Sequence, residues 1–182
     1  MTDEVNRGLQ AIANPHPKKL VLNAIPHTVK RSAGLLLFRL RDGQLEVLIA
    51  HMGGPFWARK DERAWSIIKG EYEEGEDPFE AACREFEEET GSSPPAGRTI
   101  ELGEVRQRSG KRVVAWGIDG DFDPASVRSN TFTLEWPPRS GELREFPEID
   151  RAEWVDLDTA RRKLVKGQAP FVDALERQIF GN

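Results

Sequence analysis

Hydrophobic positions along the chain predict an alternation of strands and helices. Residues 33–40 form a nearly continuous apolar run, which is typical of a strand buried on both faces. An Asp-Gly pair, Asp42 and Gly43, separates this run from a second apolar stretch at residues 45–51. Because Asp-Gly between two apolar runs is a hairpin signal, we expect residues 33–51 to form a β-hairpin.

One helix is predicted with both of its ends marked. Asp77 can cap the first turn, Pro78 suits the first helical position, and Gly91 is a fitting C-terminal stop. Between these ends apolar side chains recur at helical spacing, at Phe79, Ala82, Cys83, Phe86 and Thr90. The stripe indicates one buried face, so we interpret Cys83 as a core residue rather than a nucleophile.

The rest of the pattern adds strands and two C-terminal helices. Extended segments are predicted at residues 65–69, 99–108, 111–118, 131–136 and 151–157. Asp158 is expected to cap a helix that runs through Leu164, and Pro170 to open the last helix. We therefore expect one mixed α/β (α+β) domain over residues 32–182, preceded by a partly disordered appendage, residues 1–31.

Composition narrows the class of protein. With 38% hydrophobic and 31% charged residues, the chain has the balance of a globular protein. It shows neither a membrane-length apolar run nor a signal-peptide core, so we expect a cytoplasmic protein with no membrane partner. A net charge of −5 and the lack of an extended basic run argue against a general nucleic-acid-binding surface. The pattern carries no indication of oligomeric state.

Acidic side chains are concentrated at residues 71–89, which hold ten of them and one arginine. Glu85, Glu88 and Glu89 fall together on one flank of the predicted helix. Like charges at this spacing cost helix stability, and crowded carboxylates are the ligands that Mg²⁺ or Mn²⁺ requires. On spacing alone, a solvated acidic face is the better interpretation.

The longer pattern reverses that interpretation. Residues 70–92 resemble the signature of the Nudix hydrolases, G-x5-E-x7-R-E-U-x-E-E-x-G-U, where U is a bulky apolar residue. All seven fixed residues match, namely Gly70, Glu76, Arg84, Glu85, Glu88, Glu89 and Gly91. Ser92 departs from the second U, and Ile68 stands where a proline is frequent, but neither change removes a ligand or a base. Within the family, the resemblance is closest to a bacterial group of predicted pyrophosphohydrolases.

The resemblance implies a Nudix-type α/β/α sandwich with a mixed central sheet and hydrolysis of a diphosphate bond. By resemblance, Glu85, Glu88 and Glu89 bind Mg²⁺, with Mn²⁺ as the alternative, and a backbone carbonyl at Lys69 or Gly70 completes the shell. Such ions neutralise charge on phosphate and activate water. Arg84 and Glu76 are implied to pair with each other as a structural brace.

The resemblance also implies catalytic residues within and outside the signature. Glu85 and Glu89 are the catalytic candidates within it. A further glutamate often lies six residues before the tryptophan of the strand that precedes the C-terminal helix, which is Glu148 when counted from Trp154. Glu145 is the second choice, and an ordinary loop glutamate is the alternative reading of Glu148.

Substrate contacts are expected mainly in the loop of residues 53–63. Aromatic side chains there can stack on a base, and basic ones can meet phosphates. The candidates are Phe56, Trp57, Arg59, Lys60 and, outside the loop, Lys69 and Arg139. Arg63 is a further basic residue of the loop, and Trp65 and Trp136 are alternative stacking residues.

These features predict a Mg²⁺-dependent pyrophosphohydrolase acting on a nucleoside-diphosphate-X, a small nucleotide polyphosphate. A dinucleoside polyphosphate is favoured because the basic and aromatic loop suits an extended phosphate chain, and a nucleoside triphosphate or ADP-ribose is the alternative. Two rivals are a non-catalytic Nudix scaffold that binds a nucleotide and an RNA-end pyrophosphohydrolase, which the lack of a basic run disfavours.

Overall fold

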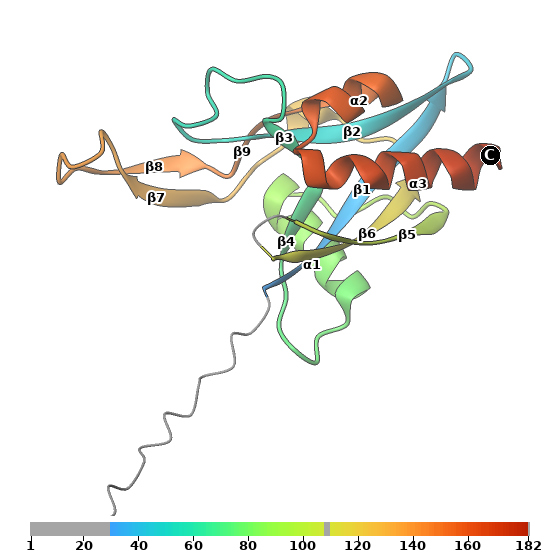
Figure 1. Cartoon of the computed structure of the whole chain (residues 1–182), viewed down its shortest axis with the longest axis horizontal. Coiled ribbons are helices and arrows are strands. Elements are labelled where there is room, and N and C mark those ends of the chain that lie inside the picture. The colour runs from blue at the N-terminus through green and yellow to red at the C-terminus, as the bar shows by residue number, and fades with distance from the viewer. Residues whose placement is uncertain (1–29, 108–109, 182) are drawn as a thin grey trace, which may run out of the picture.

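The computed structural model describes residues 30–107 and 110–181 (Figure 1). Most of the expected N-terminal appendage therefore lies outside the described residues. In chain order the elements are β1 (Arg31–Arg41), β2 (Gln44–Met52), β3 (Trp65–Ser66), β4 (Ile68–Glu71), α1 (Pro78–Thr90), β5 (Thr99–Arg106), β6 (Arg112–Asp119), η1 (Pro124–Ser126), β7 (Thr131–Glu135), β8 (Leu143–Pro147), β9 (Ile149–Asp156), α2 (Leu157–Lys163), η2 (Lys166–Gln168) and α3 (Ala169–Phe180).

Seven strands form one mixed sheet that divides along β1. This strand pairs in parallel with β6 on one side, and on its other side it changes partners halfway along. Residues 32–35 pair with β4, whereas residues 38–41 pair with β2, as the predicted hairpin requires. Because β1 and β2 diverge, the short strands β3 and β4 lie between them. Strand β9 covers the outer edge of β2.

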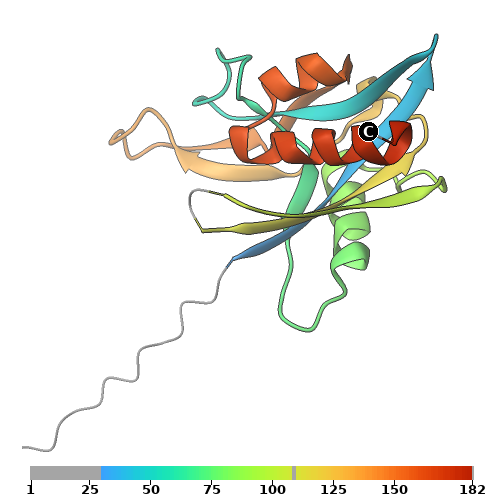
Figure 2. The ribbon, with the colours of Figure 1, turned by 45° about the vertical axis from the view of Figure 1, so that its right-hand side comes forward.

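Helices cover both faces of the sheet, and each face has its own core (Figure 2). Leu35 and Leu37 of β1 pack in the core that contains Phe86 of α1. Leu36 and Phe38 enter the opposite core, which contains Phe171 of α3. Side chains alternate between the two faces of a strand, so the buried part of β1, residues 33–38, has no charged side chain on either face. The predicted doubly buried strand and α/β/α sandwich are thereby confirmed.

Helix α1 has the ends that its sequence predicts. The Asp77 carboxylate accepts hydrogen bonds from the backbone N–H groups of Phe79 and Glu80, both at 2.9 Å. Gly91 has a left-handed backbone with φ of 76° and donates its N–H to the carbonyl of Glu87. These caps satisfy groups that a helix cannot pair internally, so they set the length of α1.

In the C-terminal third one expectation was wrong and one strand was missed. Helix α2 begins at Leu157, and its cap is Asp156, whose carboxylate accepts from the N–H of Thr159 at 2.8 Å; Asp158 instead pairs with Arg161. Strand β8 was missed, because it pairs only with β7 and its exposed residues show no apolar alternation. Together β7 and β8 form a ribbon that projects beyond the sandwich (Figure 1).

In the described ranges, no helix combines the length and the apolar character needed to cross a membrane.

The two aspartates at the start of α2 provide a direct test of its boundary. We expect Asp156→Ala to lower the free energy of unfolding by about 1 kcal/mol, because it removes the N-cap. Asp158→Ala is the matched control and should cost clearly less, since its side chain is 88% exposed. Urea denaturation of both variants measures the difference, and equal losses would contradict the assignment of the cap.

The same cap should depend on pH. The pKa of Asp156 is lowered mainly by the hydrogen bond from the backbone N–H of Thr159 and next by the one from the Thr159 hydroxyl. Burial of the carboxylate opposes this shift. Because the pKa of Asp156 is lower in the folded than in the unfolded protein, its ionised carboxylate stabilises the fold fully at a pH above the unfolded-state pKa. This stabilisation is lost as the pH falls through the folded-state pKa. The stability difference between the natural protein and Asp156→Ala should therefore shrink in acid.

Candidate active site

The site begins where β4 passes α1. Gly70 lies on β4 opposite Ala33, and a Cβ atom added at Gly70 would lie 1.6 Å from Oε2 of Glu85. That separation is far below any van der Waals contact, so only glycine lets the Glu85 carboxylate lie against the strand. Gly70 therefore provides the space in which the acidic flank of α1 meets the sheet.

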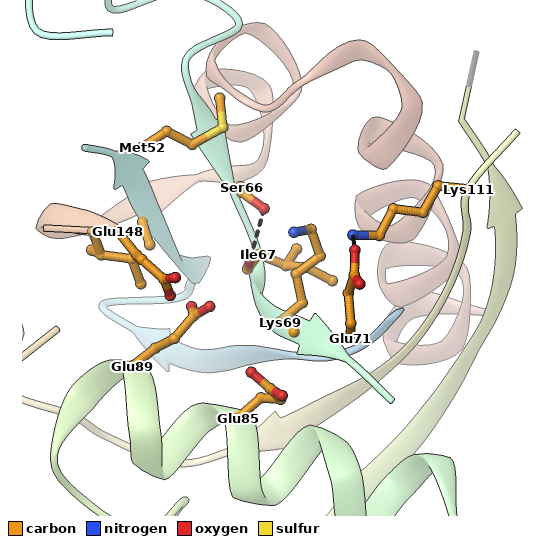
Figure 3. A pocket seen from close by; sticks show the side chains of 12 residues that line it. Met52, Ser66, Ile67, Lys69, Glu71, Glu85, Glu89, Lys111 and Glu148 are labelled. Atoms are coloured by element: carbon orange, nitrogen blue, oxygen red, sulfur yellow. Dashed lines mark hydrogen bonds and ion pairs between the residues drawn. The ribbon is translucent and has the colours of Figure 1, made fainter. Parts of the chain in front are cut away.

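Four carboxylates line a cavity of about 370 Å³ at this point, and one of them, Glu71, is paired with Lys111. Glu85 and Glu89 reach it from α1, and Glu148 reaches it from the bend between β8 and β9. Figure 3 shows the carboxylates of Glu89 and Glu148 pointing toward one another. Lys69 and Lys111 line the other side of the same cavity, where Lys111 Nζ donates to Glu71 at 2.9 Å.

Burial makes these charges costly. Glu89 is only 9% exposed, and burial raises its pKa, while Lys69 opposes the rise and Glu148 and Glu85 add to it. Burial also raises the pKa of Glu85, against the effect of Arg84. The pKa of Lys69 is lowered, again mainly by burial. The carboxylates thus lie where an added cation would lower their electrostatic energy.

As they stand, the described residues contain no group of three carboxylate, imidazole or thiol side chains arranged to hold a metal ion. The donor set and the space at Gly70 nevertheless fit a divalent cation, because hard oxygen ligands converge there without a Cβ atom in the way. Glu85, Glu89 and Glu148 would hold it. Glu88 does not line this cavity, and its carboxylate accepts from Arg84 Nη1 at 3.2 Å.

Arg84 braces the approach to the helix. Its Nε and Nη2 atoms donate to Glu76 Oε1 at 3.2 and 3.1 Å, which places together the two residues expected to pair. Its Nη1 atom donates to Glu85 Oε1 at 2.7 Å. Arg84 therefore links the loop before α1 to the carboxylate that Gly70 admits.

The loop of residues 53–63 lies elsewhere. Phe56 packs edge-on against Trp136 of the ribbon, with ring centroids 5.4 Å apart. Trp57 packs on the core that contains Phe171, and Lys60 lies over its ring. Arg139 has a left-handed backbone at the ribbon tip. Of the six expected substrate contacts, all of them in the described ranges, only Lys69 lines the cavity; Phe56, Trp57, Arg59, Lys60 and Arg139 do not.

A second cavity, of about 610 Å³, adjoins the first and shares Met52, Ser66 and Lys69 with it. Its wall is largely apolar, and it also has basic residues, Arg106 at the end of β5 and Lys166 in η2. The buried Gln168 closes one side, where its Oε1 accepts from the backbone N–H of Ile67 at 2.9 Å. Sequence reasoning missed this cavity, because its residues come from distant segments and none has a local motif.

Comparison with known proteins gives relatives over most of the chain. A family model described as the NUDIX domain matches residues 29–175. An RNA pyrophosphohydrolase of Rhodospirillum rubrum is 30% identical over 152 residues, which cover 78% of this chain and 87% of that protein.

An octanoyltransferase of Myxococcus xanthus is 35% identical over 108 residues, or 58% of this chain, but the match spans only 27% of that protein's length. Among solved structures, a C. elegans Ap4A hydrolase in a binary complex has a TM-score of 0.56 and 21% identity, covering 85% of this chain and 100% of that one. At that identity the structural likeness shows the fold alone.

The fit of a divalent cation can be tested without substrate. We expect Mn²⁺ to raise the Tm of the natural protein, since a ligand that binds only the folded state stabilises it by mass action. Glu85→Gln and Glu89→Gln should each reduce this shift strongly, because each removes a donor from the shared cavity. Calorimetric scans with and without Mn²⁺ measure the effect.

Glu87→Gln is the matched control, because Glu87 is exposed on the same helix. It should keep the full Mn²⁺-dependent shift. If Glu85→Gln and Glu87→Gln responded to Mn²⁺ equally, Glu85 would not be a ligand.

Proposed function

Because the chain belongs to the Nudix hydrolase family, as the match of the family model over residues 29–175 shows, we propose that it hydrolyses a diphosphate bond of a dinucleoside polyphosphate. The single observation that carries the choice of substrate is the pair of adjoining cavities. One is lined by carboxylates, and the other combines an apolar wall with basic side chains. An extended substrate with a polyphosphate between two nucleosides can occupy both.

The first cavity is the proposed place of bond cleavage. A divalent cation bound there would neutralise charge on the phosphates and increase the acidity of water. Glu148 accepts a proton from the attacking water while the water oxygen bonds to phosphorus. The bond from phosphorus to the bridging oxygen then breaks. Lys69 and Lys111 bind phosphate oxygens on the opposite side, so that the leaving phosphate departs with its charge compensated.

The second cavity is the proposed place for the remote part of the substrate. Arg106 and Lys166 contact phosphates beyond the cleaved bond, and Met52 and Val165 offer an apolar surface to a nucleoside. One cavity for bond cleavage and another for the remote phosphates support a dinucleoside polyphosphate over a nucleoside triphosphate. They also support it over ADP-ribose, whose phosphate chain is shorter.

A second candidate is the removal of pyrophosphate from the 5′ end of RNA. It is favoured by the 30% identity to the RNA pyrophosphohydrolase of Rhodospirillum rubrum. The sequence argued against it because no extended basic run is present. The structure, however, gathers Lys69, Lys111, Arg106 and Lys166 around the two cavities from four separate segments. Such a cluster is able to hold a 5′-triphosphate although no basic run exists along the chain.

Replacing the proposed base tests the mechanism. Glu148→Gln should lower kcat on a dinucleoside polyphosphate by about 10²- to 10⁴-fold, which is typical for loss of a general base. Glu145→Gln is the matched control, because Glu145 is exposed on β8 and lines neither cavity. Steady-state kinetics with Mg²⁺ measure both. Full turnover by Glu148→Gln, or an equal loss in Glu145→Gln, would contradict the assignment.

The proposed binding of remote phosphates in the second cavity can be tested with a panel of substrates. We expect Arg106→Ala and Lys166→Ala to raise KM for a dinucleoside polyphosphate more than for a nucleoside triphosphate, since they contact remote phosphates. Arg59→Ala, in the loop of residues 53–63, should leave KM unchanged. The panel includes ADP-ribose and a 5′-triphosphate oligonucleotide, with products identified by chromatography.

Each result of the panel has a clear meaning. Preferred cleavage of the oligonucleotide would select the RNA-end candidate. A KM that responds to Arg59→Ala and not to Arg106→Ala would return substrate recognition to the loop. Hydrolysis of no member of the panel would favour a non-catalytic scaffold.

A further inference from the structure

Two segments, residues 129–130 and Gly53, hold the backbone at Glu148 in the bend between β8 and β9. The Glu148 N–H donates to the carbonyl of Asn130 at 2.9 Å, and the Glu148 carbonyl accepts from the N–H of Gly53 at 2.8 Å. The next N–H, that of Ile149, donates to Ser129 Oγ at 2.9 Å. With its backbone groups paired in this way, Glu148 can direct only its side chain into the cavity (Figure 3).

The contact with Gly53 requires glycine. A Cβ atom at Gly53 would lie 1.9 Å from the carbonyl oxygen of Pro147 and 3.4 Å from the carbonyl carbon of Glu148. Both neighbours are backbone atoms, so they cannot turn aside as a flexible side chain would. Any side chain at position 53 would therefore push the Pro147–Glu148 segment away from its place.

A β-bulge follows at the next residues. His51 pairs with Arg151, but Met52 pairs with Ile149, so Asp150 is an extra residue on β9. If the pairing were regular and had no bulge, Met52 would face Asp150, and every residue toward Glu148 would be displaced by one position. The bulge therefore fixes which residue of this segment occupies the bend.

His51 connects the bulge to Lys60 in the loop of residues 53–63. Its Nδ1 atom lies 2.7 Å from Asp150 Oδ1, and its Nε2 atom lies 2.8 Å from the carbonyl oxygen of Lys60. The ring is fully buried and packs edge-on against Trp65, with centroids 5.1 Å apart. Arg151 Nη1 also lies 3.3 Å from Asp150 Oδ1, so the carboxylate is held by two basic side chains.

The loop is thus attached directly to Glu148 at Gly53 and, through His51, to the adjacent bulge at Lys60. We propose that Gly53, His51 and Asp150 are positioning residues that hold the Glu148 carboxylate in the catalytic cavity. The loop of residues 53–63 then contributes to hydrolysis through Glu148 rather than by touching the substrate. This inference rests on the function proposed above, since it takes Glu148 as the base.

Two substitutions test it. Asp150→Asn weakens the tie between the bulge and His51, and Gly53→Ala displaces the Glu148 backbone directly. Each should lower kcat on the order of 10- to 100-fold, the effect of a small misplacement of a catalytic group, with KM unchanged. Glu142→Gln is the control: its exposed carboxylate pairs with Arg144 of the ribbon, away from the bulge and the cavity, and kcat should stay at the natural value.

A double-mutant cycle separates positioning from a general structural effect. In a Glu148→Gln background, Asp150→Asn should cause no further loss of kcat, because there is no base left to misplace. Unfolding curves check that every variant is folded. If Gly53→Ala does not fold, Asp150→Asn carries the test alone.

The outcomes are distinct. A rise in KM with unchanged kcat would show that the loop contacts substrate and would overturn the inference. So would additive losses in the Glu148→Gln background, or natural kcat in Asp150→Asn. Full turnover by Glu148→Gln alone is a different result, since it would overturn the proposed role of Glu148 and the inference with it.

Discussion

The close approach of β4 to α1 is the constraint on which the rest of the site depends. It is possible because residue 70 is glycine, so the Glu85 carboxylate occupies the space of a side chain. It also requires β4 to be carried to that place, which follows from the divergence of β1 and β2. Where β1 and β2 diverge, β6 supports β1 on its other side, pairing in parallel with residues 31–38. A local contact between a strand and a carboxylate thus depends on the pairing of the entire sheet.

Charge is distributed unevenly within this framework. Glu85 and Glu89 of α1 face Lys69 of β4 and Lys111, which precedes β6. Burial opposes the charged forms of Glu85, Glu89 and Lys69. A core made only for stability would not contain such a set, because apolar residues of the same size would cost less. The unfavourable electrostatics are concentrated around one cavity, and the two apolar cores on either side of the sheet offset them.

Sequence reasoning succeeded where the determining interactions are local. Helix α1 has its caps and its apolar stripe within one short segment, and the first hairpin has its turn between two apolar runs. The signature residues were recognisable for the same reason. The boundary of α2 was less determined, because Asp156 and Asp158 are both acceptable caps and the choice depends on where β9 ends. The second cavity and the bulge were beyond local patterns altogether: His51 and Asp150 are 99 residues apart in the chain. The loop of residues 53–63 shows the difference well, since its composition suits a ligand while its contacts are with the ribbon, the bend at Glu148 and α2.

The two ends of the ribbon of β7 and β8 differ in how well they tolerate inserted or deleted residues. Its base continues directly into the bend at Glu148, so an inserted or deleted residue there would alter the register of β9. Its tip, residues 137–142, is exposed and makes its backbone contacts within the ribbon. Relatives of different length can therefore differ at the tip while keeping the same active site. For the same reason the tip is a suitable place to attach a fluorophore that would report on the ribbon without entering the cavities.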